Sequence, residues 1–171
     1  MHYGTIKPYD IANGTGVRVS LFVSGCRHHC KGCFNSETWN FDYGQPFTEE
    51  THKYLIELLK PSYIEGFSLL GGEPFEPENQ AVLTGLLKDI HQTYPDKTIW
   101  CYTGYLYDVD LIPGGKVFTP YTAEMLSYID VLVDGEFIEA QKDISLAFRG
   151  SSNQRILHLK ESANQKTLFQ Q

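Results

Sequence analysis

The sequence has no apolar run that approaches the roughly 20 residues of a membrane-spanning helix. Its first residues show no basic head followed by an apolar stretch, so we expect no signal peptide. It also has no long run of lysine and arginine, and its net charge is −7. A nucleic acid or a membrane surface is therefore a poor expected partner. These absences predict a cytoplasmic protein.

Internal repeats, low-complexity tracts and linkers are also missing, and cysteine is scarce, with four in 171 residues. A cytoplasmic chain with so few cysteines uses them as metal ligands or free thiols rather than as a disulfide framework. The length and a hydrophobic content of 42% suit one folded domain with its own core. We expect a single domain over residues 1–171, with its sequence motifs confined to about 11–155.

Three of the cysteines, Cys26, Cys30 and Cys33, are clustered with Cx3CxxC spacing after an apolar run. A structural zinc site needs four closed ligands and usually shows paired CxxC units or two cysteines with two histidines. Three thiolates suit an iron–sulfur cluster that keeps one iron without a protein ligand, and such an iron can bind a small molecule. The spacing favours a reactive cluster, and a zinc site remains the alternative.

Alternating strand and helix patterns predict an α/β fold. We expect helices starting near residue 48 and ending before Pro61, then over 78–94 and 122–129, with 1–16 loop-like and 136–147 unassigned. Right-handed βα units of this number are too few for a closed eight-stranded barrel, so an open, partial TIM-like barrel of about five to six units is expected. The predicted strands cover 17–24, 66–70, 98–102, 131–133 and 155–159.

Most of the motifs follow directly after a predicted strand. In parallel α/β folds the carboxyl ends of the strands meet at the edge where ligands bind. The sequence therefore predicts that the motifs surround one site.

The segment 25–35, GCRHHCKGCFN, resembles the cluster loop of radical S-adenosylmethionine enzymes. In detail it resembles the activases of anaerobic ribonucleotide reductase, because Gly32 stands before the third cysteine where many radical enzymes have an aromatic residue. Phe34 follows that cysteine instead. The resemblance implies the radical S-adenosylmethionine fold.

Four further motifs carry the same resemblance in the same order: GGEP at 71–74, WCYTGY at 100–105, DVLVDGEF at 130–137 and RGSSNQ at 149–154. Each could also be an ordinary strand end, turn or helix cap. Pyruvate formate-lyase activases carry a lysine where this chain has Glu136, which argues against that subfamily.

The resemblance implies that Cys26, Cys30 and Cys33 bind a [4Fe–4S] cluster and that S-adenosylmethionine binds its open iron. No separate acid–base residue is expected, since the cofactors carry the chemistry. The cofactor contacts that it implies are Gly32, Cys33, Phe34, Gly71, Gly72, Glu73, Tyr102 and Asp134.

Cys101 lies inside a predicted strand and is expected to be an inert buried thiol. His28 and His29 could bind metal, but the resemblance assigns ligation to cysteine alone, so we expect them to shape the loop.

As an activase, the chain would be an oxidoreductase that cleaves S-adenosylmethionine reductively and forms a glycyl radical on the large subunit of anaerobic ribonucleotide reductase. A flavodoxin or a thioredoxin system is the expected electron donor. The alternatives are an activase of another glycyl-radical enzyme, a radical enzyme with a small substrate and, from another class, a zinc-stabilised interaction module.

Overall fold

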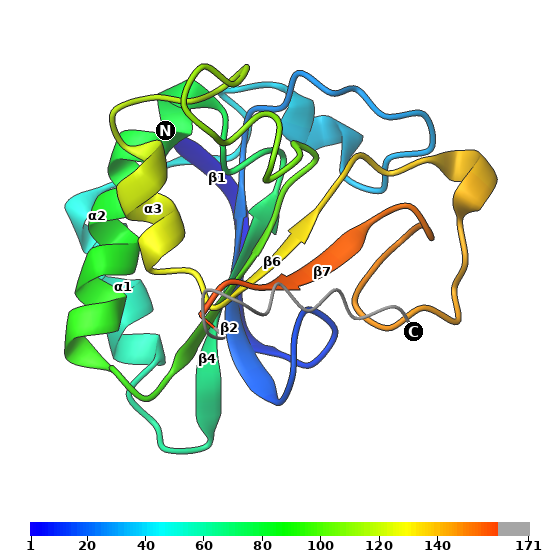
Figure 1. The fold of residues 1–171 in the computed structure, drawn as a ribbon. Helices are drawn as coiled ribbons and strands as arrows, with labels where there is room; N and C mark the ends of the chain where they lie inside the picture. The colour runs from blue at the N-terminus through cyan, green and yellow to red at the C-terminus, as the bar shows by residue number, and fades with distance from the viewer. Residues whose placement is uncertain (161–171) are drawn as a thin grey trace.

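A seven-stranded mixed sheet with helices on one face forms the structure, a computed structural model that describes residues 1–160 (Figure 1). The strand order is β3-β1-β2-β4-β5-β6-β7. The strands are β1 (His2–Asp10), β2 (Val17–Val23), β3 (Gln45–Pro46), β4 (Ile64–Gly71), β5 (Thr98–Tyr102), β6 (Val131–Asp134) and β7 (Arg155–His158). The helices are α1 (Glu49–Leu58), α2 (Pro77–Thr93) and α3 (Thr122–Ser127), with 3₁₀ turns η1 (Ser36–Trp39) and η2 (Glu139–Gln141).

Four parallel strands, β2, β4, β5 and β6, form the centre of the sheet. The three α-helices lie in the connections between them and cover the same face (Figure 1). Local sequence starts α1 and α2: Thr48 and Thr51 form a capping box before α1, and Pro77 occupies the first turn of α2. The five strands and three helices predicted over residues 17–159 are all present, which confirms the α/β class.

Alternate residues of the central strands divide between the two faces of the sheet. On the helix side, Val19 and Leu21 of β2 pack with Leu69 and Leu132 in the main core. The opposite face carries a smaller core around Trp100, where polar groups are also buried. Both faces of the central strands are therefore covered, as is usual for parallel strands. The loops at the carboxyl ends of these strands can line a cavity while the strands themselves stay buried.

The edges of the sheet differ from the prediction. Residues 1–16 were expected to be a loop, but 2–10 form β1, which pairs antiparallel with β2 and with the short β3. β7 also pairs antiparallel, with β6. The six residues between β1 and β2 contain no helix, and the segment between β6 and β7 contains only the three-residue turn η2, so neither forms the helical crossover that joins parallel strands. The prediction of five to six βα units is therefore wrong, and the described residues form one open sheet in which four strands are parallel.

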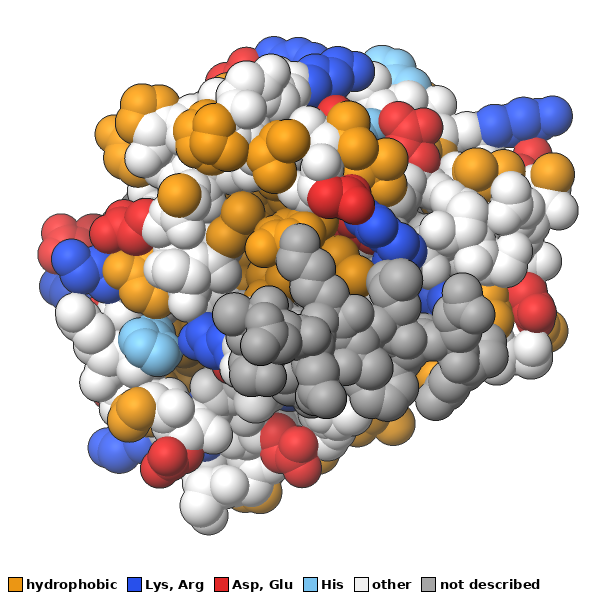
Figure 2. Space-filling view, viewed as in Figure 1, with side chains coloured by type: hydrophobic (Ala, Val, Ile, Leu, Met, Phe, Trp, Pro, Cys, Tyr) orange, Lys and Arg blue, Asp and Glu red, His pale blue; other side chains and the backbone are white. Residues whose placement is uncertain are grey.

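Within residues 1–160, no helix is long and apolar enough to cross a membrane. Acidic and basic side chains are interspersed on the face shown in Figure 2, without an extended basic patch there. That distribution is consistent with the lack of a lysine and arginine run in the sequence.

Candidate functional site

The loop that carries the three cysteines starts where β2 ends, and backbone hydrogen bonds hold it on two sides. Gly25 adopts φ of +99°, which lets the chain turn sharply out of the sheet. Its amide donates to the Thr38 carbonyl at 2.7 Å, and its carbonyl accepts from the Glu73 amide at 2.8 Å. The Cys26 amide donates to the Trp39 carbonyl at 3.2 Å. The loop is thus fixed between η1 and the segment after β4.

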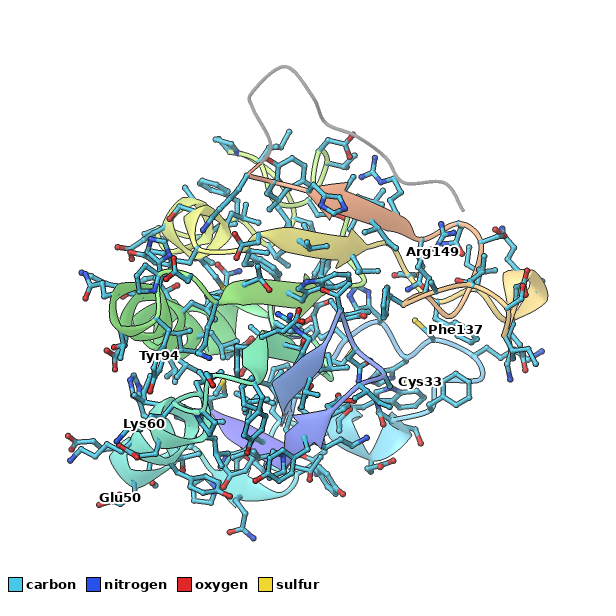
Figure 3. All side chains as sticks on the ribbon, turned by 90° about the horizontal axis from the view of Figure 1, so that it is seen from below. Cys33, Glu50, Lys60, Tyr94, Phe137 and Arg149 are labelled. Carbon is cyan, nitrogen blue, oxygen red and sulfur yellow. The ribbon has the colours of Figure 1, made fainter. Side chains whose placement is uncertain are left out.

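All three cysteines line one cavity of about 230 Å³ at the carboxyl ends of the parallel strands, on the face opposite the helices. Figure 3 shows Cys33, Phe137 and Arg149 at this end of the molecule, where the cluster loop faces the segment between β6 and β7. The described walls are Cys26, His28, Cys30, Cys33, Phe34, Asn35, Trp39, Leu70, Gly71, Gly72, Tyr102, Thr103, Gly104, Val133, Gly135, Phe137, Arg149, Gly150 and Gln154.

The cysteine set fits a cluster better than a single ion. All four thiols of the chain are free, and Cys101 lies apart, fully buried in the main core. Within residues 1–160, no three histidine, cysteine or acidic side chains converge on a point that would suit one metal ion. In a cubane cluster each thiolate binds a different iron, so three thiols spread around a cavity are the arrangement required.

Burial favours the protonated form of two of these thiols, Cys26 and Cys30. It raises the pKa of Cys26 to about 12, and it also raises the pKa of Cys30. Protonated thiols are poor nucleophiles, whereas a bound metal displaces the proton and holds the thiolate. Cys26 and Cys30 are therefore suited to ligation rather than to covalent catalysis.

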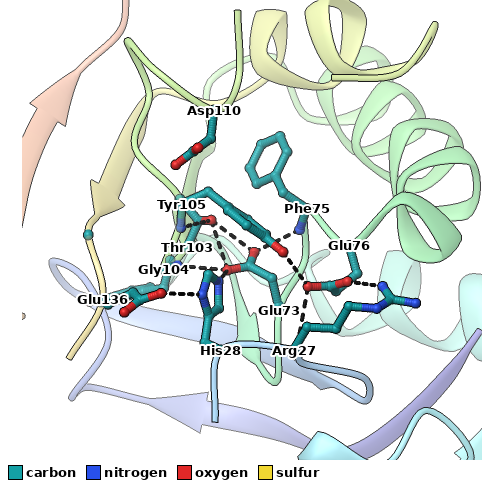
Figure 4. Close-up of polar contacts among 12 residues, drawn as sticks. Arg27, His28, Glu73, Phe75, Glu76, Thr103, Gly104, Tyr105, Asp110 and Glu136 are labelled. Atoms are coloured by element: carbon teal, nitrogen blue, oxygen red, sulfur yellow. Dashed lines mark hydrogen bonds and ion pairs between the residues drawn. The ribbon is translucent and has the colours of Figure 1, made fainter. Parts of the chain in front are cut away.

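Glu73 of the GGEP motif has no solvent-exposed surface and is used inside the protein (Figure 4). Its carboxylate accepts hydrogen bonds from the Phe75 amide at 2.9 Å and from the Gly104 amide at 2.7 Å. The Thr103 hydroxyl lies 2.8 Å from one oxygen, and His28 Nε2 lies 2.9 Å from the other. Glu73 thereby links the cluster loop to the end of β5, and its oxygens are occupied by protein donors.

His28 lies between two carboxylates (Figure 4). Its Nε2 contacts Glu73, and its Nδ1 lies 2.8 Å from Glu136 on the loop after β6. Burial alone would disfavour the imidazolium, but the hydrogen bonds and charges of these two partners outweigh it and raise the pKa of His28 to about 8. His28 is not a spare metal ligand, since both ring nitrogens already have carboxylate partners.

Arg27 provides a second anchor for the cluster loop. Its guanidinium pairs with the buried carboxylate of Glu76 and, at 2.5 Å, with Glu78 of α2. The Tyr105 hydroxyl donates to Glu76 at 2.7 Å, and the Arg27 guanidinium lies 4.6 Å from the centre of the Phe41 ring. The loop is therefore held through charged side chains as well as through its backbone.

The RGSSNQ motif forms one wall of the cavity through Arg149, Gly150 and Gln154. The Gln154 amide oxygen accepts from the Gly150 and Ser151 amides at 2.9 and 3.1 Å. Its NH₂ group donates to the Gly135 carbonyl at 3.0 Å. The first two bonds close the motif on itself and the third fastens it to the end of β6, so it shapes the cavity and is more than a surface turn.

Several of the predicted site residues meet in this cavity. Gly71 and Gly72 approach the cluster loop so closely that a methyl group on Gly72 would lie 2.7 Å from the Gly25 carbonyl oxygen. The predicted residues that line the cavity are Cys26, Cys30, Cys33, Phe34, Gly71, Gly72 and Tyr102.

Three predicted contacts, Gly32, Glu73 and Asp134, are not among the cavity walls. Gly32 is exposed, and Glu73 is occupied as described. Asp134 is buried and binds the Arg155 guanidinium, with Nε to Oδ1 at 2.8 Å, and the Tyr107 amide at 2.8 Å. Its carboxylate therefore joins β6 to β7.

Some cavity residues were missed by the sequence analysis. Phe137 and Gln154 lie in motifs that were recognised, but were not singled out. Asn35 closes the recognised loop segment. Trp39 lies beyond it, in η1, and the only sequence signal was an aromatic residue close to the cysteines.

A family model described as a 4Fe-4S single cluster domain matches residues 12–157. Among curated proteins, the anaerobic ribonucleoside-triphosphate reductase-activating protein of Salmonella typhi is 42% identical over 162 residues, covering 94% of this chain and all of that protein. The protein of the same name from Escherichia coli K12 is 41% identical over 162 residues, with the same coverage. That of Enterobacteria phage T4 is 41% identical over 157 residues, covering 91% of this chain and 93% of its own length.

Proposed function

Because the chain belongs to the family of anaerobic ribonucleoside-triphosphate reductase-activating proteins, we propose that it activates an anaerobic ribonucleotide reductase by forming a glycyl radical on its large subunit. The observation that carries this proposal is the cavity in which Cys26, Cys30 and Cys33 meet Gly71 and Gly72. When bound, a [4Fe–4S] cluster would supply the electron for reductive cleavage of S-adenosylmethionine, and the 5′-deoxyadenosyl radical so released would take a hydrogen atom from the glycine.

In this proposal the residues of the chain bind and orient the cofactors, and the cofactors carry out the reactive steps. The three cysteines bind the cluster. Gly71 and Gly72 expose backbone to the methionine end of S-adenosylmethionine, while Tyr102 and Phe34 border the rest of the cofactor. Four parallel strands with a cavity at their carboxyl ends support a partial barrel of the radical S-adenosylmethionine type.

The anchors Arg27 and His28 have a role in the same scheme. Each joins the cluster loop to a carboxylate that has no solvent exposure, and a buried carboxylate is stable only when it is paired and hydrogen-bonded. The loop is therefore held in one conformation before the cofactor binds. Such preorganisation favours the geometry needed for electron transfer into the sulfonium.

The test uses the reduced, cluster-loaded protein with S-adenosylmethionine and the large subunit of an anaerobic ribonucleotide reductase. We expect an electron paramagnetic resonance doublet from a glycyl radical. Replacing the acceptor glycine of the reductase with alanine should remove the doublet and leave the complex intact. Reductase that stays silent while S-adenosylmethionine is cleaved would contradict the assignment of the partner.

Pyruvate formate-lyase is the comparison partner. The position where its activases carry lysine is Glu136, which pairs with His28 here, so we expect charge to discriminate against that enzyme. A doublet of equal yield on pyruvate formate-lyase would favour a general activase. We infer a cytoplasmic reaction, with a flavodoxin or a thioredoxin system as the electron donor.

A further inference from the structure

Trp39 and Tyr102 each carry a buried polar atom, Nε1 and Oη respectively, that has no hydrogen-bond partner in the described part of the chain. Both residues line the cavity. A buried donor that makes no hydrogen bond costs free energy, so such donors in a cavity indicate the groups that a ligand must offer. Tyr102 was already expected at the cofactor. Trp39 was not, and its indole N–H can only donate.

Trp39 lies at the Gly72 end of the cavity. Its backbone carbonyl accepts from the Cys26 amide, and the carbonyl of its neighbour Thr38 accepts from Gly25. A methyl group placed on Gly72 would lie 2.9 Å from that Thr38 oxygen. Trp39 therefore lies beside the part of the cavity where Cys26 and the GGEP motif meet.

The orientation of the indole is restrained by His29. The two rings stack with centroids 4.3 Å apart and planes inclined by 11°. His29 itself adopts φ of +50°, in the left-handed region that is uncommon outside glycine but is adopted more often by Asn, Asp and His than by other residues. The stack therefore limits rotation of the Trp39 ring.

We propose that the Trp39 indole N–H binds the carboxylate of S-adenosylmethionine. This inference rests on the proposed function, which brings the methionine end of the cofactor to Gly71 and Gly72. The α-amino group of the cofactor is excluded as a partner where it is an ammonium, because an ammonium only donates. A cluster sulfide would be a weaker acceptor than a carboxylate, which forms charge-assisted bonds.

The charges around the cavity agree with an anionic group. Its described walls include Arg149 and His28 and contain no aspartate or glutamate. The carboxylate of the GGEP motif, Glu73, is turned into the protein, where it contacts His28 and the Thr103 hydroxyl. A ligand carboxylate therefore enters without repulsion from an acidic side chain of the wall.

The experiment compares two ligands on two variants of the cluster-loaded protein: S-adenosylmethionine and its decarboxylated analogue, measured anaerobically by equilibrium dialysis. Trp39→Phe keeps an aromatic ring for the His29 stack and removes the N–H. It should weaken binding of S-adenosylmethionine by roughly 10- to 100-fold and leave that of the decarboxylated analogue unchanged. The matched control is Trp100→Phe, which changes the other tryptophan, a buried residue outside the cavity walls, and should leave both affinities unchanged.

Other results overturn the inference. Equal affinity of wild type and Trp39→Phe for S-adenosylmethionine would show that the N–H does not contact it. An equal loss of affinity for both ligands would show that Trp39 contributes only to the shape of the site. A shifted reduction potential of the cluster with unchanged affinity would assign the N–H to a sulfide.

Two further controls distinguish failure of this inference from failure of the proposed function and from misfolding of the variant. A wild-type protein that binds neither ligand would refute the cofactor of the proposed function, and this inference with it. If Trp39→Phe does not fold, β-(3-benzothienyl)alanine incorporated into the Trp100→Phe background replaces the Trp39 N–H with sulfur in a ring of the same shape. That protein should show the same selective loss.

Discussion

At the scale of single residues, the cluster loop is organised by two glutamates without solvent exposure. Glu73 and Glu76 each bind a basic side chain of the loop, His28 and Arg27 respectively. Removing one partner would leave a buried charge without compensation, which is more costly than the pair itself is stabilising. The four side chains therefore act as two pairs, and the loop adopts the conformation that satisfies both.

Substitution of the three cysteines of the cluster loop should affect the protein differently from substitution of Cys101. Changing Cys26, Cys30 or Cys33 to alanine is expected to abolish S-adenosylmethionine cleavage and to lower iron content, because each supplies one thiolate to the cluster. Cys101→Ala should keep both and cost on the order of 1 kcal/mol of stability, since it only leaves a small void in the core. Iron analysis and the visible spectrum of anaerobically prepared protein measure this. Loss of the cluster in Cys101→Ala would refute the ligand assignment.

Gly72→Ala tests how closely the two loops are packed. The added methyl group would lie 2.7 Å from the Gly25 carbonyl oxygen and 2.9 Å from that of Thr38, and both belong to the backbone. We expect a loss of about 1–3 kcal/mol of stability together with reduced cluster content. Gly85→Ala is the control, because a methyl group there meets nothing within 4 Å. Normal cluster content and stability in Gly72→Ala would contradict the contact.

At the scale of elements, the antiparallel pair β1–β2 is closed by one carboxylate. Asp10, the last residue of β1, accepts from the Ser20 hydroxyl of β2 at 2.6 Å. It also accepts from the Ala12 amide at 2.9 Å and the Asn13 side chain at 2.8 Å in the connecting turn. The turn and the strand pairing are therefore joined at a single side chain, which explains how a polar segment with a proline becomes a strand.

The protonation of Asp10 should make stability depend on pH. Burial alone would raise its pKa, but the hydrogen bonds from Ser20, Asn13 and Ala12 outweigh burial and hold the pKa below the ordinary value of 3.8. The ionised form thus stabilises the fold fully above that ordinary value, and the stabilisation is lost as the pH falls through the lower folded-state pKa.

Asp10→Asn should lose about 1 kcal/mol at pH 7, because an amide cannot accept all three bonds. It should also lose less stability than the wild type between pH 5 and pH 2. Urea unfolding at several pH values measures both effects. Parallel pH profiles for the two proteins would contradict this role of Asp10.

At the scale of the whole molecule, the core does not depend on the cysteines. The main core combines residues of β2, β4, β5 and β6 with residues of all three helices. Of the four cysteines, only Cys101 belongs to it. In small zinc domains, by contrast, binding of the metal supplies the folding free energy.

Removal of the cluster should therefore leave the fold in place. Oxidation followed by chelation is expected to abolish the visible spectrum while the far-ultraviolet circular dichroism and a single cooperative unfolding transition persist. The same protein should lose protection from hydrogen exchange only around residues 24–35. Global unfolding on chelation would instead favour the alternative of a zinc-stabilised interaction module, whose fold depends on the metal.

The sequence predicted the edge of the sheet at which the cavity lies, because its motifs follow strand ends and parallel strands end at a common edge. It could not decide which motif residues face the cavity. Successive residues of a strand point to opposite faces, so Val133 and Gly135 line the cavity while Asp134 between them does not. Glu73 is turned inward for a related reason, since apart from the Phe75 amide the groups that contact its carboxylate come from residues 30 or more positions away.

By itself, the sequence determined the α/β class, the parallel strands with their helices and the three cysteines, because hydrophobic periodicity and ligand spacing are local properties of the chain. Only the tertiary structure decided the antiparallel edges, the inward position of Glu73 and the place of Trp39 in the cavity wall. These features depend on which distant segments pack together. The short connection between β1 and β2 lets the polar strand β1 pair with β2 at the edge of the sheet, and His28 contacts Glu73 and Glu136 across the site. Burial then leaves the Trp39 N–H without a partner from residues 1–160, a feature that no local pattern records.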